Sequence, residues 1–164
     1  MAKIGTEQPL VPSVLDRLLD FDRSARTENL KSQVQVLAEL RESVRRDLAD
    51  ILNLHVRCRT FPPELTELNQ SPLSIGIPDA ATVQLGSDQG RNQLVKQIER
   101  TIRQFEPRFK TVKVSLQENA DSLDRTFRFR IDALLHAYPA PEPVVFDSAF
   151  QPISGIYSVE RGNR

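Results

Sequence analysis

The chain has few of the residues from which disulfide-rich or carbohydrate-binding proteins are built. Its 164 residues include one cysteine, Cys58, two tyrosines and no tryptophan. One thiol cannot form an internal disulfide, which is typical of proteins in a reducing compartment. The shortage of tryptophan and tyrosine leaves few rings on which a sugar could stack. A disulfide-stapled secreted domain and a carbohydrate-stacking platform are therefore both disfavoured.

The chain also lacks net charge and long apolar runs. Its 22 Lys and Arg residues balance its 22 Asp and Glu residues, whereas binding to nucleic-acid phosphates needs a local cationic excess. No stretch approaches the roughly 20 apolar residues of a membrane span, and residues 1–7 contain no apolar core of a signal peptide. We therefore expect no nucleic-acid partner, no membrane insertion and a cytoplasmic location.

Three stretches have the apolar spacing of amphipathic helices. The first is predicted over residues 13–20, where the hydroxyl of Ser13 can cap the first turn. The second is predicted over residues 30–57, and its apolar residues recur at steps of three and four: Val34, Leu37, Leu40, Val44, Leu48, Ile51 and Leu52. The third is predicted over residues 88–105 and should stop there, because the residue before Pro107 is disfavoured in helical geometry.

The second half of the chain changes to the period-two alternation of strands. One hairpin is predicted from residues 112–116 and 127–133, and a second from residues 144–150 and 153–159 around Gln151-Pro152. Helices followed by strands indicate an α+β fold, with two to three N-terminal helices packed on a small antiparallel sheet of about four strands. We expect residues 112–116 or 153–159 to form a sheet edge that is open to a partner strand.

The predicted domain organisation is simple. Residues 1–11 are expected to form a flexible N-terminal arm, residues 12–160 a single domain and residues 161–164 a C-terminal tail. Residues 60–86 are rich in proline and glycine, and a connection of that length needs packing to be ordered. The apolar residues expected to supply that packing are Leu65, Leu68, Leu73, Ile75 and Ile77.

No pattern of reactive side chains predicts a catalytic or metal site. His55 and Cys58 are three residues apart, but a zinc site needs three or four ligands and no second pair accompanies them. Residues 86–92 lack the spacing of a phosphate-binding loop and are expected to form a loop and a helix cap. Glu99 and Glu106 lie on one helical face, about 10 Å apart along the axis, which is weak support for a glycosidase pair. We expect no catalytic residue, no cofactor and no metal.

The segment Glu106-Pro107-Arg108 lies where the helical period ends and the strand period begins. Because proline fixes the direction of the backbone, the carboxylate and the guanidinium on either side are held at defined angles. Two interpretations are open: the two charges pair within the domain and fix the corner, or they form charge-assisted hydrogen bonds with a partner chain. We predict Glu106, Pro107 and Arg108 as partner-binding residues.

With this segment in view, the chain resembles the gene-25-like family of contractile-tail baseplate wedge proteins, and more narrowly the TssE subunits of type VI secretion baseplates. The likeness covers most of the chain. It consists of a leucine-rich opening at residues 13–19, a long helix ending in a basic segment at residues 41–53, a Gly-Ile-Pro-Asp segment at residues 76–79, and a helix that runs through Glu-Pro-Arg at residues 98–109 into a strand. Residues 57–65 depart from the family because they lack the glycine-rich loop of many relatives.

The resemblance implies a structural role. Such proteins lie in the baseplate wedge and connect it to the first ring of the contractile sheath. The implied partners are the wedge subunits TssF, TssG and TssK and the sheath subunits TssB and TssC, in an assembly docked at the inner membrane. The family also carries a lysozyme-like label, so a peptidoglycan-cleaving enzyme is the alternative. We expect the structural role, because the sequence offers no convincing pair of catalytic carboxylates.

Overall fold

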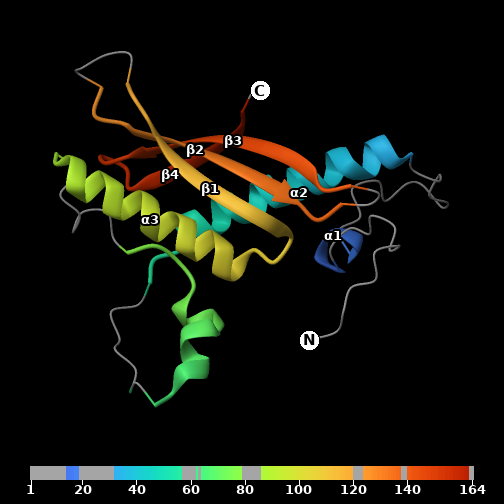
Figure 1. The fold of residues 1–164 in the computed structure, drawn as a ribbon, viewed down its shortest axis with the longest axis horizontal. Helices are drawn as coiled ribbons and strands as arrows, with labels where there is room; N and C mark the ends of the chain where they lie inside the picture. The colour runs from blue at the N-terminus through green and yellow to red at the C-terminus, as the bar shows by residue number, and fades with distance from the viewer. Residues whose placement is uncertain are drawn as a thin grey trace.

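A computed structural model describes residues 14–18, 32–56, 62, 64–78, 86–119, 124–137 and 140–162. Helices α2 (Gln33–Asn53) and α3 (Asp88–Phe105) cover one face of a four-stranded antiparallel sheet (Figure 1). The strands are β1 (Phe109–Gln117), β2 (Phe127–Leu135), β3 (Glu142–Gln151) and β4 (Ile156–Arg161). A short α1 (Val14–Leu18) and two 3-10 helices, η1 (Thr66–Gln70) and η2 (Pro72–Ser74), complete the described elements. The predicted α+β fold is confirmed, whereas the proposed arm at residues 1–11 lies outside the described residues.

The ends of α2 are set by specific hydrogen bonds, local at the start and long-range at the end, and they differ from the predicted limits of 30 and 57. Ser32 and Gln35 form a capping box, in which the Ser32 N–H donates to the Gln35 side chain at 2.9 Å and the Gln35 N–H donates to the Ser32 hydroxyl at 3.3 Å. At the other end Leu54 is extended, and its carbonyl accepts the Ile77 N–H at 2.8 Å. The helix therefore stops at Asn53, because the next backbone groups pair with a later segment.

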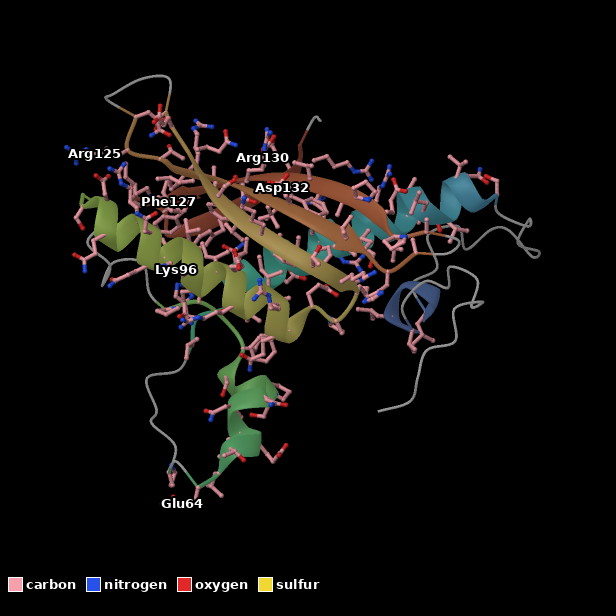
Figure 2. The ribbon with its side chains drawn as sticks, in the orientation of Figure 1. Glu64, Lys96, Arg125, Phe127, Arg130 and Asp132 are labelled. Carbon is pink, nitrogen blue, oxygen red and sulfur yellow. The ribbon has the colours of Figure 1, made fainter. Side chains whose placement is uncertain are left out.

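That later segment depends on one glycine. Gly76 has a φ of 122°, and a Cβ atom there would lie 2.4 Å from the Leu54 carbonyl oxygen. Only glycine permits both this conformation and this close approach. Ile77 is consequently buried, but Leu65 and Leu73 are about half exposed on a segment that projects from the body, with Glu64 at its far end (Figure 2). The expectation that Leu65 and Leu73 order this segment by packing is wrong.

Both hairpins are longer than the sequence predicted. Strand β1 begins at Phe109 because a register shift between Phe109 and Thr111 lets Phe109 and Val112 both face the core. Strand β4 begins at Ile156 rather than at Ile153, because the turn occupies residues 152–155 and Gly155 takes a φ of 69°. Ile153 is fully exposed at the turn. Arg161, predicted as the start of the tail, is the last residue of β4.

The strands follow one another in the order β1-β2-β3-β4, so that β1 and β4 are the two edges of the sheet. One face packs on α2 and α3, and it includes the fully buried Phe129 and Phe146. The opposite face is polar and carries Arg130 and Asp132 (Figure 2). The two segments predicted as candidate edges thus overlap the two edge strands.

Candidate functional site

The corner between α3 and β1 is built around Glu106. Its N–H closes α3 by donating to the Ile102 carbonyl at 2.9 Å, and its carbonyl accepts the Phe109 N–H at 3.3 Å. Its carboxylate accepts the Arg108 N–H at 3.1 Å and the Arg108 Nε–H at 2.7 Å. Glu106 is only 3% exposed, so its charge is compensated inside the protein.

Arg108 extends this corner to α2. Its Nη1 donates to the Ser43 hydroxyl at 3.1 Å, and its Nη2 lies 2.5 Å from Asp47 Oδ2. Ser43 and Asp47 are four residues apart on one face of α2, which places both within reach of one guanidinium. Glu106, Arg108, Asp47 and Ser43, named here the corner clamp, connect the start of the sheet to the middle of the long helix.

Electrostatics hold the guanidinium of Arg108 in its charged form. Burial lowers the pKa of the Arg108 guanidinium, but the hydrogen bonds and negative charges of Glu106 and Asp47 outweigh this effect and raise the pKa above its usual value. Arg108 is therefore a permanent cation between two acids. The structure thus contains the pairing of Glu106 with Arg108 inside the domain, the first of the two interpretations of this segment.

Part of the corner still faces outward. Pro107 is exposed at the tip of the corner, and about a quarter of the Arg108 side chain, 23%, is accessible. The structure therefore separates the three predicted partner-binding residues. Pro107 and the accessible part of Arg108 are available for contact, whereas Glu106 lies behind them.

Side chains of α2 cover the outer edge of β4. The Asn53 amide accepts the Tyr157 N–H at 2.9 Å and donates to the Tyr157 carbonyl at 2.9 Å. Nearer the start of α2, Arg45 Nη1 donates to the Val159 carbonyl at 3.1 Å. Backbone groups that an edge strand would otherwise present to solvent are thus occupied by helix side chains.

Side chains of α3 cover part of the other edge, along β1. Glu99 accepts the Val114 N–H at 3.1 Å, and Arg103 donates to the Val112 carbonyl at 3.2 Å. The two side chains also pair with each other at 2.8 Å. Both edges of the sheet therefore carry side-chain hydrogen bonds, which the sequence pattern does not predict.

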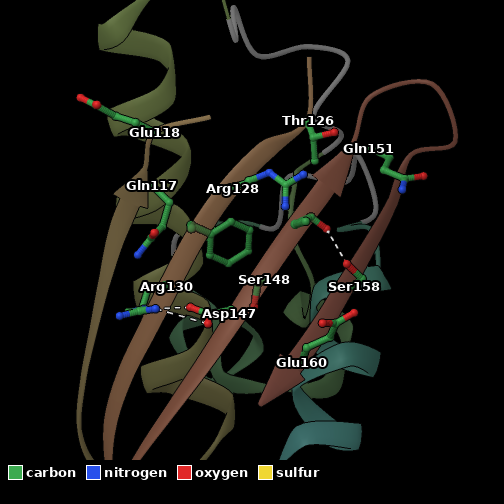
Figure 3. Close-up of a pocket in the computed structure, with 12 residues that line it drawn as sticks. Gln117, Glu118, Thr126, Arg128, Arg130, Asp147, Ser148, Gln151, Ser158 and Glu160 are labelled. Carbon is green, nitrogen blue, oxygen red and sulfur yellow. Dashed lines mark hydrogen bonds and ion pairs between the residues drawn. The ribbon is translucent and has the colours of Figure 1, made fainter. Parts of the chain in front are cut away.

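The face of the sheet that points away from the helices forms a shallow polar hollow of about 390 Å³ (Figure 3). Arg130 lies against Asp147 in this hollow, with Nε–Oδ1 and Nη2–Oδ2 distances of 2.8 and 3.3 Å. Glu160 faces Asp147 from β4 in the strand register. Because this face carries charges of both signs, it has no single-sign field that would attract a polyanion.

The remaining residues singled out in the sequence do not form a reactive site in the described structure. His55 is exposed, Cys58 lies outside the described residues, and the described part of the chain contains no group of three His, Cys, Asp or Glu side chains that could hold a metal. Ser87 caps α3 by accepting the Gly90 N–H at 3.1 Å, which confirms the helix cap predicted within residues 86–92. Among the described helices, none combines the length and the apolar character that a membrane span requires.

Several residues of the clamp and of the sheet edges were missed in the sequence. The charged side of α2, which is typical of a solvated face, carries these residues: Ser43, Asp47, Arg45 and Asn53. The i, i+4 spacing of Ser43 and Asp47 was the one available signal. Sequence spacing gives no indication that Asn53 meets a strand 104 residues later.

Comparison with known proteins places these features in one family. A family model described as baseplate wedge protein gp25 matches residues 38–140, which is more than half of the chain. The matched span begins in α2 and includes both sides of the corner clamp. No curated protein matches the chain. The family match confirms the resemblance seen in the sequence, and the chain belongs to the baseplate wedge protein gp25 family, with a structural role in a baseplate.

Proposed function

We propose that the chain is a baseplate wedge subunit of a type VI secretion system that connects the wedge to the contractile sheath and starts sheath assembly. The corner clamp is the observation that carries this proposal. Family membership supports a baseplate role, and the Glu-Pro-Arg corner supports a surface built for a fixed partner. In this role the chain works in the cytoplasm, within an assembly docked at the inner membrane.

The clamp gives the corner a rigid shape before any partner arrives. Arg108 is held by Glu106, Asp47 and Ser43, so little conformational freedom remains to be lost when the corner is bound. Pro107 is exposed and has a fixed backbone angle, which adds to this preorganisation. We assign the contact to Pro107 and Arg108, with Glu106 as the residue that positions Arg108. The partners are the wedge subunits TssF, TssG and TssK.

The second connection, between the chain and the contractile sheath, is made by the sheet. Its two edge strands, β1 and β4, are the places where an extended segment of a sheath subunit can add as a further strand. The partners on this side are TssB and TssC. A four-stranded sheet that receives a fifth strand would give the first sheath ring a template with a defined register.

The test is co-purification of the chain with TssF, TssG and TssK, followed by a binding titration of a Pro107→Ala variant. Pro107 is exposed, so the variant should keep its urea unfolding curve. Loss of a preorganised interface contact should weaken binding by about 5- to 30-fold. Pro152→Ala, in the exposed turn between β3 and β4, is the matched control and should bind as the unmodified chain does.

The outcomes separate the parts of the proposal. If the unmodified chain does not co-purify with these wedge subunits, the type VI role is wrong. If it does, and Pro107→Ala binds with unchanged affinity, the role stands and the corner is not the contact.

A further inference from the structure

Residues 64–74, named here the projection, form an ordered surface without a core of its own. No residue of η1 or η2 is buried. Hydrogen bonds take the place of apolar packing, because two serine hydroxyls of the segment both donate to the Leu68 carbonyl, at 2.7 and 2.6 Å. Leu65 and Leu73 are left 50% and 49% exposed. A segment that polar bonds hold in shape and that presents leucines to the outside is typical of a contact surface.

The base of the projection is fixed on α3. The Thr101 hydroxyl donates to the Gly76 carbonyl at 3.4 Å, and the Gln104 amide nitrogen donates to the Asn69 carbonyl. Both bonds come from the C-terminal half of α3, so the projection leaves the body at a fixed place beside this helix (Figure 1). The projection and α3 therefore form the two arms of an open angle.

The two arms carry opposite charges. The projection contains Glu64 and Glu67, and residues 62–78 include no Lys, Arg or His. Helix α3 exposes Lys96 and Arg100, which lie one turn apart on the same face. No ion pair or hydrogen bond within the described residues reaches any of these four side chains. Two like charges at this spacing destabilise a helix, so the stability of α3 does not account for the two cations.

We propose that a second copy of the chain occupies this surface, in a symmetric pair in which the projection of each copy lies along α3 of the other. Glu64 and Glu67 of one copy then meet Lys96 and Arg100 of the other, and the twofold axis repeats the same contact. Within one chain the two groups do not meet, since Figure 2 places Lys96 on α3 and Glu64 at the far end of the projection. The pairing goes beyond the proposed function and does not depend on it.

The pair also covers the leucines of the projection. The aliphatic stems of Lys96 and Arg100 can lie over Leu65 and Leu73 while their charged ends reach the glutamates. Each ion pair of this kind is exposed at its rim and therefore contributes little by itself. Salt screens such contacts, so raising the salt concentration from 0.05 to 0.5 M should weaken the pair by about tenfold.

Sedimentation velocity of the full chain over a range of concentrations tests the pair. The double variants Glu64→Lys with Glu67→Lys, and Lys96→Glu with Arg100→Glu, should each stay monomeric, because like charges then face each other in both contacts. An equal mixture of the two variants should pair again, because every contact joins opposite charges. Glu160→Lys, at an exposed glutamate on β4, is the matched control and should pair as the unmodified chain does. Circular dichroism shows that each variant keeps its fold.

Three results would overturn the pair. One is an unmodified chain that stays monomeric at about 1 mM in low salt. Another is a pair that survives either double reversal, and the third is a mixture of folded variants that does not recover. If the chain is monomeric and reversal of Glu64 and Glu67 weakens its binding to purified TssF–TssG, the projection serves a wedge subunit and the second copy is the wrong occupant. The wedge role itself is decided by co-purification of the unmodified chain, so the two proposals fail separately.

Discussion

Glu106 is the most deeply buried charged side chain in the described part of the chain, and Arg108 supplies its compensation. A buried carboxylate is costly unless an opposite charge and hydrogen bonds surround it. Arg108 meets this condition with three separate partners, Glu106, Asp47 and Ser43. At the scale of residues, the stability of the corner therefore depends on one guanidinium.

Replacing Arg108 by alanine should lower the free energy of unfolding by about 3 kcal/mol, because Glu106 would remain buried without its partner. Urea unfolding followed by circular dichroism measures this change. Arg128→Ala is the control, since Arg128 is half exposed in its pair with Asp124, and it should cost no more than about 1 kcal/mol. Equal losses in the two variants would mean that the clamp does not stabilise the fold.

Asp124 is a second residue with a testable electrostatic state. Hydrogen bonds from the Thr126 side chain and backbone, and then from Arg128, lower the pKa of its carboxyl to about 2. Because the folded-state pKa lies below the usual value of 3.8, the stabilising contribution is present above about pH 4 and is lost as the pH falls toward 2.

Nuclear magnetic resonance of the carboxyl carbons measures this pKa directly. The Asp124 signal should titrate with a midpoint near 2, and Thr126→Val should move the midpoint upward because one hydrogen bond to the carboxylate is removed. A midpoint near 4 in the unmodified chain would contradict the hydrogen-bonding arrangement at Thr126.

At the scale of elements, the sequence predicts those helices and strands whose limits are determined by neighbouring residues. Helix α3 is confirmed at both ends, because a serine cap at Ser87 and the proline at position 107 mark them within the sequence itself. All four strands are predicted by their alternating apolar residues. The order of helices and strands then indicates the α+β class.

The elements were misplaced where their limits depend on distant partners. Helix α2 ends early because Leu54 pairs with Ile77 across a stretch of more than twenty residues. The start of β1 is hidden by the register shift next to Phe109, which breaks the alternation that strands otherwise show. The candidate site depends on distant partners in the same way. The local sequence pattern indicated Glu106 and Arg108. Ser43, Asp47 and Asn53 could not be predicted from it, because they act only through contacts made in three dimensions.

At the scale of the whole molecule, the acidic residues that raise the question of a lysozyme-like enzyme have other tasks. Glu106 belongs to the corner clamp, and Glu99 bonds to Arg103 and to the Val114 N–H. A glycosidase needs one carboxyl to protonate the leaving group and another to act as nucleophile or base across the sugar. Both glutamates are instead engaged in hydrogen bonds and ion pairs within the fold.

We therefore expect purified protein to release no soluble fragments from insoluble peptidoglycan above the level of a heat-denatured sample. Hen lysozyme serves as the positive control for the substrate. Release well above the denatured sample, and abolished in Glu99→Gln or Glu106→Gln, would contradict the purely structural role.

The strand order has a consequence for how the chain folds. Each strand pairs with its neighbour along the chain, so the sheet can form by successive short loop closures, which favours rapid formation. Helix α2 is different, because Asn53 meets Tyr157 only across 104 residues. During synthesis α2 leaves the ribosome before any strand, and its apolar stripe is incompletely covered until β4 has been made. Transiently exposed apolar surface of this kind favours aggregation of an unfinished chain, and the bond between Asn53 and Tyr157 marks the end of that exposed period.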